Sequence, residues 1–132
     1  MTEASAYVVE EIEEKLESSV KMLLSALNKS RRSISGKKDL ASYEQGLEGV
    51  LRLFDKTVEE YPEDQELKKI VDRFSSFYSE KGLIDEQAQK EKLSNISSDL
   101  KSLIQWRKLE TAHGRTLGFS DFRSLRSESK KR

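Results

Sequence analysis

The 132-residue chain has no cysteine, a single proline, a single histidine and no long apolar run. Without cysteine it cannot form a disulfide framework, a thiolate nucleophile, a zinc ribbon or an iron–sulfur cluster. No apolar run approaches the roughly 18 residues that cross a membrane, and the N-terminus is acidic where a signal or transit peptide would be basic. We therefore expect an intracellular protein, cytoplasmic or nuclear, with no transmembrane segment.

Hydrophobic residues are scarce as well. They make up 35% of the chain and charged residues 36%, whereas typical globular domains have about 45–50% apolar and about 25% charged residues. Such a composition suits a thin helical bundle with much surface, or helices that complete their core against a partner protein. The length is that of one domain.

The single histidine, His113, argues against catalysis. A hydroxyl nucleophile normally needs a base such as histidine, and His113 stands beside Gly114 at the expected end of a helix. Glu110 and His113 have the Glu-x-x-His spacing of di-iron bundles, but such sites need two of these pairs. We expect a protein with no catalytic residue, no metal and no cofactor.

Paired carboxylates are abundant near the N-terminus, for example Glu10 with Glu14 and Glu13 with Glu17. The helical period places them opposite the apolar stripe, so we expect them to be solvated. A carboxyl group that works as a general acid or base needs a partly dry pocket that shifts its pKa. These acids are therefore expected to form a solvated helix face.

Apolar residues recur at helical spacing in four segments, and none of the chain alternates like a strand. The predicted helices span about residues 3–32, 39–61, 62–81 and 85–113. Short connections favour antiparallel neighbours, so the sequence predicts an all-α, antiparallel four-helix bundle with a short extra C-terminal helix or tail. The alternative is an elongated helical hairpin assembly, in which the second and third helices form one kinked rod and dimerisation completes the core.

Four residues are expected to mark helix ends. Asp39 and Asp85 are predicted as N-caps, Pro62 as the first residue of the third helix, and Gly82 as a left-handed terminator. Ile34 is expected to continue the seven-residue apolar repeat of the first helix. On the fourth helix, the inner stripe is expected to reach Trp106 or Arg107.

Two glycines, Gly46 and Gly49, fall inside the second predicted helix. Each costs about 1 kcal/mol relative to alanine in a helix interior. Two such costs three residues apart indicate either the close approach of a neighbouring backbone or two tolerated surface glycines. The sequence leaves both interpretations open.

The zero net charge conceals a basic cluster at residues 29–38, which contain five cations and no acid. Cations at a helix C-terminus are favoured by the helix dipole, so part of the cluster needs no ligand. A cluster of this density also suits phosphate oxygens of nucleic acid, lipid headgroups or an acidic protein. The candidate anion-binding residues are Lys29, Arg31, Arg32, Lys37 and Lys38.

The chain ends in a basic segment, residues 115–132, which follows the predicted bundle domain of residues 1–114. Disordered tails are poor in large apolar residues, whereas this segment has four within nine positions. These side chains either fold back over the bundle or dock onto another protein as a short helix. The candidate partner-binding residues are Arg115, Leu117, Phe119, Phe122, Arg123, Leu125 and Arg126.

These features predict a non-enzymatic helical interaction module, a small adaptor or structural subunit of a multi-protein complex. Its partner would be another protein, in a hetero-complex or a homodimer, bound through the bundle seams and the C-terminal segment. The alternative is a small helical nucleic-acid-binding subunit that contacts phosphates through residues 29–38 and the basic C-terminus.

Overall fold

The computed structural model describes residues 3–29, 33–112, 118–119 and 121–124, and of residues 110–112 the backbone alone. Its main elements are α1 (Ala6–Leu27), α2 (Ile34–Glu60), α3 (Gln65–Glu80), the short 3-10 helix η1 (Lys81–Leu83) and α4 (Glu86–Ala112). Residues 119 and 121–124 are also helical. The described residues contain no strand, so the all-α prediction is confirmed.

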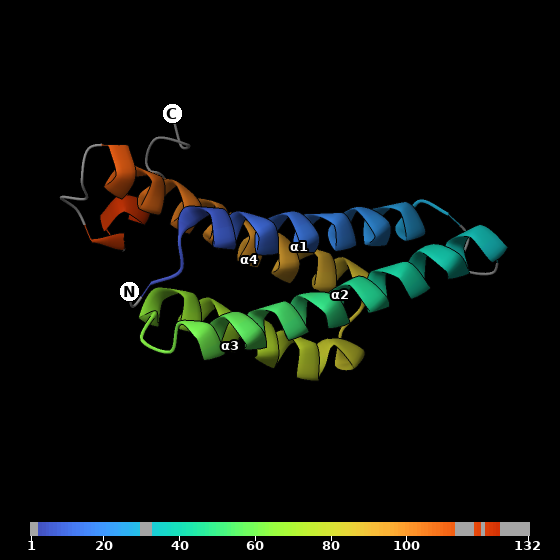
Figure 1. Ribbon diagram of the computed structural model, residues 1–132. Helices are drawn as coiled ribbons and strands as arrows, with labels where there is room; N and C mark the ends of the chain where they lie inside the picture. The colour runs from blue at the N-terminus through green and yellow to red at the C-terminus, as the bar shows by residue number, and fades with distance from the viewer. Residues whose placement is uncertain (1–2, 30–32, 113–117, 120, 125–132) are drawn as a thin grey trace, which may run out of the picture.

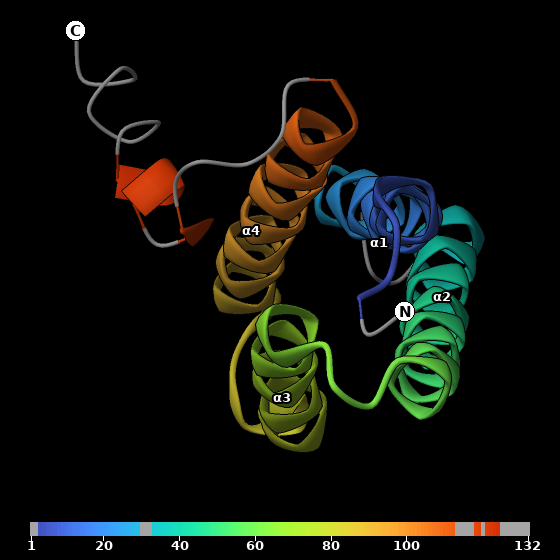
Figure 2. The same ribbon diagram turned by 60° about the vertical axis from the view of Figure 1, so that its left-hand side comes forward.

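The four long helices form a bundle in which α1 lies between α2 and α4, while α3 packs against α2 and α4 (Figure 2). Successive helices run in opposite directions (Figure 1). The chain turns sharply after α2, because the Tyr61 N–H closes the last turn on the Thr57 carbonyl and Pro62 follows it. The predicted bundle and the predicted corner at Tyr61–Pro62 are confirmed, and α2 and α3 are two helices and not one kinked rod.

The core is built by apolar stripes from all four helices. The Phe54 and Phe74 rings pack at a tilt of 56° with their centroids 5.3 Å apart, and the Phe77 ring centroid lies 6.0 Å from that of Phe74. The largest fully buried side chains are Tyr43, Phe54, Phe74, Ile12, Leu16, Leu23, Leu47, Leu67, Leu93, Leu100, Leu103 and Val9. The scarce hydrophobic residues therefore converge on one continuous core.

The start of α2 differs from the prediction. Ser33, not Asp39, is the N-cap, because its hydroxyl oxygen accepts a 2.9 Å hydrogen bond from the Gly36 N–H. The helix therefore begins at Ile34, and the Lys37 N–H closes its first turn on the Ser33 carbonyl. Ile34 does not continue the apolar repeat of α1, since 85% of its surface is exposed.

The boundaries of α3 also differ in detail. Asp64 caps this helix by accepting a 3.1 Å hydrogen bond from the Leu67 N–H, so Pro62 lies in the preceding turn and is not its first helical residue. Gly82 sits in η1 without a left-handed conformation, since the 3-10 turn replaces the expected glycine terminus. Asp85 caps α4 as predicted and accepts a 2.8 Å hydrogen bond from the Ala88 N–H. The predicted end at His113–Gly114 lies outside the described residues.

The two glycines of α2 face different parts of α1. A Cβ atom added at Gly46 would lie 2.0 Å from the Ser19 hydroxyl oxygen, and one at Gly49 would lie 2.8 Å from the Lys15 Cε atom. Real Cβ atoms essentially never come that close to a neighbour. At Gly46 the structure therefore favours the close approach of a neighbouring backbone, since the Ser19 Cα would lie 3.6 Å from the added Cβ, whereas at Gly49 only the flexible end of Lys15 is near.

Candidate docking surfaces at the two ends of the bundle

One end of the molecule is a helical hairpin that extends past the rest of the bundle. Helix α3 has 16 residues, whereas α2 has 27, and η1 and the start of α4 contact α2 at Glu44 and Tyr43. There Lys81 pairs with Glu44, and the Tyr43 hydroxyl donates a 2.6 Å hydrogen bond to Gln89. The end of α1 and the start of α2 continue beyond this point (Figure 1). We call residues 24–29 and 33–40 the projecting hairpin.

Apolar side chains of the projecting hairpin are incompletely covered. Leu27 and Leu40 are half-buried at the edge of the core, and Ile34 is exposed. Deeper between α1 and α2, Leu23, Leu47 and Val50 are fully buried, and no large aliphatic side chain described there is as exposed as Ile34. The apolar contact between α1 and α2 therefore continues past the ends of α3 and α4, which cover it in the rest of the bundle (Figure 1).

A carboxylate of α2 holds the two arms of the projecting hairpin together. Asp39 accepts hydrogen bonds from the Lys29 ammonium at 2.8 Å and from the Ser25 hydroxyl at 2.7 Å. The Lys29 hydrogen bond, followed by that of Ser25, lowers the pKa of the Asp39 carboxyl below its ordinary value. Lys29 is thus engaged within the chain, whereas Lys37 and Lys38 are exposed. The other predicted anion-binding residues, Arg31 and Arg32, lie outside the described residues.

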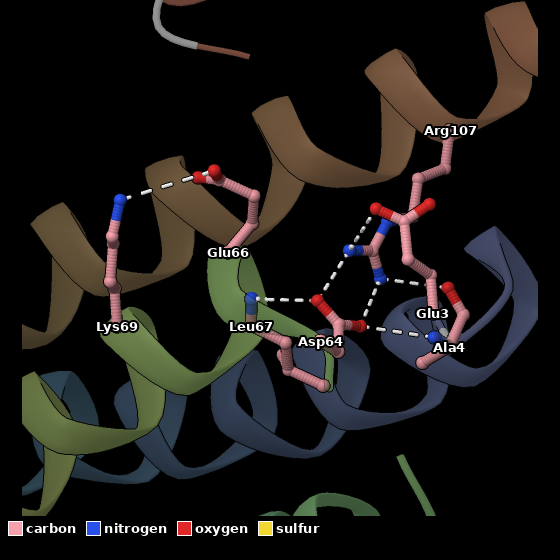
Figure 3. A network of polar contacts seen from close by, with 7 residues as sticks. All are labelled: Glu3, Ala4, Asp64, Glu66, Leu67, Lys69 and Arg107. Carbon is pink, nitrogen blue, oxygen red and sulfur yellow. Dashed lines mark hydrogen bonds and ion pairs between the residues drawn. The ribbon is translucent and has the colours of Figure 1, made fainter. Parts of the chain in front are cut away.

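At the opposite end, a buried ion pair joins three parts of the chain (Figure 3). The Arg107 guanidinium donates to both oxygens of Asp64, at 2.6 and 2.7 Å, and to the Ala4 carbonyl at 2.7 Å. The same carboxylate accepts a 3.0 Å hydrogen bond from the Ala4 N–H and caps α3. Both side chains are almost fully buried. This clamp fastens the N-terminal segment and the start of α3 to α4.

Only part of this clamp could be expected from the sequence. Arg107 appeared on the expected inner stripe of α4, and Asp64 appeared as an acid near the start of a helix. Their pairing joins residues 43 positions apart. No periodicity indicates such a partnership, so it had to come from the packing of α3 against α4.

The C-terminal segment, defined by residues 118–119 and 121–124, lies against α4 near this same end (Figure 1). The Phe119 side chain is 6% exposed, with its ring centroid 5.4 Å from that of Trp106. Phe122 is half-buried against the core. These residues fold back over the bundle, which is one of the two arrangements considered for them. Arg115, Leu117, Leu125 and Arg126 lie outside the described residues.

An arginine of the C-terminal segment completes a shared ion pair. Arg123 lies 2.8 Å from an oxygen of Asp99, which also pairs with Arg73 of α3. The Arg123 guanidinium carbon lies 5.7 Å from the centroid of the Phe119 ring. Asp99 therefore connects the segment to both α3 and α4.

The predicted face of solvated acids is interrupted by Glu13. This residue is 5% exposed, accepts a 2.8 Å hydrogen bond from the Ser97 hydroxyl and lies 3.7 Å from the Lys101 ammonium. Glu10 pairs with Lys108. The expectation that Glu13 is solvated was wrong, because α4 brings a hydroxyl and a cation against this position of α1. Glu13 works as an interhelical contact.

Two open grooves lie along α4, one on its α1 side and one on its α3 side. The first, of about 470 Å³, runs between α1 and α4 over Val20, Leu24 and Ser97. The second, of about 400 Å³, runs between α3 and α4 over Phe77 and Ile96 and is bordered by Arg73. In the part of the chain that the structure describes, no three histidine, aspartate or glutamate side chains gather as a metal site.

The comparisons with known proteins give no relative. No protein-family model, no curated protein and no solved structure matches the chain. Among the described helices, none combines the length and apolar character needed to span a bilayer.

Proposed function

We propose that the protein is a non-enzymatic helical interaction module, a small adaptor or structural subunit that docks onto another protein. The observation that supports this proposal is the projecting hairpin, whose apolar seam continues beyond the helices that cover it elsewhere. Exposed apolar surface of this kind is typical of a contact surface for a second protein. The C-terminal segment supplies a second candidate surface at the other end.

The arrangement of the basic residues favours this function over nucleic-acid binding. The alternative requires residues 29–38 and the C-terminus to contact one run of phosphates. Lys37 and Lys38 lie on the projecting hairpin, whereas Arg123 lies near Trp106 at the opposite end of the bundle. Arg123 is also paired with Asp99. A salt-dependent binding assay with RNA and DNA separates the two functions, because phosphate contacts weaken steeply as salt rises.

Two equally exposed aliphatic residues allow a matched test of the hairpin surface. Ile34 is 85% exposed on the projecting hairpin, and Leu83 is 87% exposed in η1. We expect Ile34→Glu to remove bound partners from the native assembly, and Leu83→Glu to leave them in place. The measurement is the native mass of the full-length chain recovered from cells, with circular dichroism to confirm that both variants fold.

Two results would contradict the proposal. One is a monomeric wild-type chain under all native conditions. The other is an equal loss of partners in both variants, which would show that any added surface charge dissociates the assembly. A preserved assembly in the Leu83→Glu chain together with its loss in the Ile34→Glu chain supports docking through the hairpin.

A further inference from the structure

The C-terminal segment covers a surface whose shape does not depend on the segment itself. Trp106 and Asp99 are carried by α4, in the main body of the bundle, and Asp99 is also held by Arg73 of α3. The segment adds one buried side chain, Phe119, one half-buried side chain, Phe122, and the ion pair of Arg123. We call the surface formed by Trp106, Asp99 and Arg73 the Trp106 face.

The described contacts of the segment with the bundle are made by Phe119, Phe122 and Arg123. A helix of one or two turns is not stable alone in water, so its order depends on the docked side chains and on its attachment to the chain. Within the segment, the Phe122 N–H donates a 3.0 Å hydrogen bond to the Gly118 carbonyl. A longer helix with the same anchoring side chains would bury more surface on the same face.

The surface next to the segment continues along α3 and α4. The segment runs antiparallel to α4. Phe119 packs on Trp106, and Arg123, four residues later in the segment, pairs with Asp99, which lies seven residues earlier in α4. Beyond Asp99 in that direction lies the α3–α4 groove, which has Phe77 and Ile96 in its lining and Lys92 further along. Arg73 borders this groove and also pairs with Asp99. The Trp106 face and the groove thus form one continuous surface.

We propose that the Trp106 face is a docking site for a partner helix with an aromatic residue followed four positions later by an arginine, and that the C-terminal segment occupies it when the partner is absent. Residues four apart share one side of a helix, as Phe119 and Arg123 do here. The aromatic ring packs on Trp106, and the arginine pairs with Asp99. This inference rests on the proposed function and adds a second site, with its partner chemistry, at the other end of the bundle.

The chain offers a direct probe of this site. Trp106 is its only tryptophan, so its fluorescence reports on the Trp106 face alone. The ligand to be used is a synthetic peptide of residues 115–126, which contains Phe119 and Arg123 and no tryptophan. The receptor is the 132-residue chain with Phe119→Ala. In this variant the chain's own C-terminal segment lacks the buried Phe119 side chain that packs on Trp106. The comparison is the wild-type chain titrated with the same peptide.

We expect the peptide to bind the Phe119→Ala chain at least tenfold more tightly than the wild-type chain. In the wild-type chain, the attached C-terminal segment competes with the peptide for the Trp106 face. A peptide with Arg123→Glu should bind the same receptor at least tenfold more weakly. If Phe119→Ala does not fold, a full-length Arg123→Glu chain serves as the receptor, since Arg123 is exposed and its loss removes one ion pair. Arg52→Glu, at another exposed arginine with a carboxylate partner, is the control and should bind the peptide as the wild type does.

Three results would overturn the inference. The first is a folded Phe119→Ala chain whose Trp106 fluorescence does not respond to the peptide. The second is equal binding by the wild-type chain and both segment variants. The third is a wild-type dimer that Phe119→Ala converts to monomer, which would assign the site to the segment of a second copy. The peptide experiment does not involve Ile34 or Leu83. A negative result for the Trp106 face is therefore distinguishable from failure of the proposed function.

Discussion

Arg107 and Asp64 form a buried, two-bonded ion pair, although 43 positions separate them along the chain. The carboxylate is at once the N-cap of α3, the acceptor for the Ala4 N–H and the counterion of Arg107. One side chain thus determines how α3, α4 and the N-terminal segment meet. Removing either Arg107 or Asp64 would leave the charge of the other residue buried without a counterion.

The first prediction concerns this pair. Arg107→Met should lower the free energy of unfolding by about 3–5 kcal/mol, because it leaves the Asp64 charge buried and uncompensated. Adding Asp64→Asn should restore part of the loss, since a neutral asparagine still caps the Leu67 N–H. Urea unfolding followed by circular dichroism measures both effects.

The control is an exposed ion pair on the same protein. Arg52 and Glu48 are largely solvated, so Arg52→Met should change the free energy of unfolding by about 0–1 kcal/mol. A loss in Arg107→Met no larger than that in Arg52→Met would show that the clamp contributes little to stability.

Periodicity was enough to predict the bundle because each helix buries a regular apolar stripe. The stripe of α3, from Leu67 to Phe77, is an example that needs no tertiary information. Helix ends were harder, since Ser33 and Asp39 are both acceptable caps and the geometry of the connection decides between them. Asp39 instead binds Lys29 and Ser25 across the hairpin.

The candidate surfaces were predictable only in part, because their contacts also depend on how the helices and the C-terminal segment pack. Charge counting identified the basic residues near the hairpin, and apolar content identified Phe119 and Phe122. Neither signal could indicate that Arg123 would meet Asp99, because that contact depends on how the segment folds back over α4. Whether a partner binds either surface stays a prediction.

The second prediction concerns the contact between Gly46 and Ser19. Gly46→Ala should destabilise the protein by about 1–3 kcal/mol, because the new Cβ would lie 2.0 Å from the Ser19 Oγ and 3.2 Å from its Cβ. The gain in helix propensity of about 1 kcal/mol offsets only part of this overpacking. Thermal and urea unfolding of the single variant measure the loss.

Two further variants sharpen this test. Ser19→Ala should rescue part of the loss in Gly46→Ala, because the Ser19 hydroxyl is buried and has no hydrogen-bond partner among the described residues. Gly49→Ala should be neutral or stabilising by up to about 1 kcal/mol, since only the flexible end of Lys15 must move. Equal destabilisation by both glycine variants would count against a backbone contact confined to Gly46.

The third prediction concerns the phenol of Tyr43 at alkaline pH. Burial, followed by the nearby charges of Glu44 and Glu86, raises the pKa of Tyr43 above its ordinary value of 10.0. The folded state therefore keeps this phenol neutral while the unfolded state ionises, so stability is complete below pH 10 and is lost as the pH rises above it. Absorbance of phenolate at alkaline pH should show Tyr43 ionising only as the protein unfolds.

Tyr43→Phe provides the comparison for this titration. This variant loses the hydrogen bond to Gln89, which lowers its stability at neutral pH by about 1 kcal/mol. Below the unfolding transition its phenolate absorbance should match that of the wild type. A smaller absorbance in the variant before unfolding would show that Tyr43 ionises in the folded state.

The fourth prediction concerns the Asp39 carboxyl of the projecting hairpin. Because Lys29 and Ser25 lower its pKa from the ordinary value of 3.8, its charged form stabilises the fold above that pH, and this contribution is lost as the pH falls below it. Asp39→Asn should therefore be less stable than the wild type at pH 7, and the difference should shrink between about pH 4 and pH 2. The measurement is urea unfolding across that range at low salt, where the partly exposed Lys29 ammonium is least screened. Glu48→Gln, at an exposed pair, is the control, and a wild-type advantage over Asp39→Asn that stays constant down to pH 2 would contradict the depressed pKa.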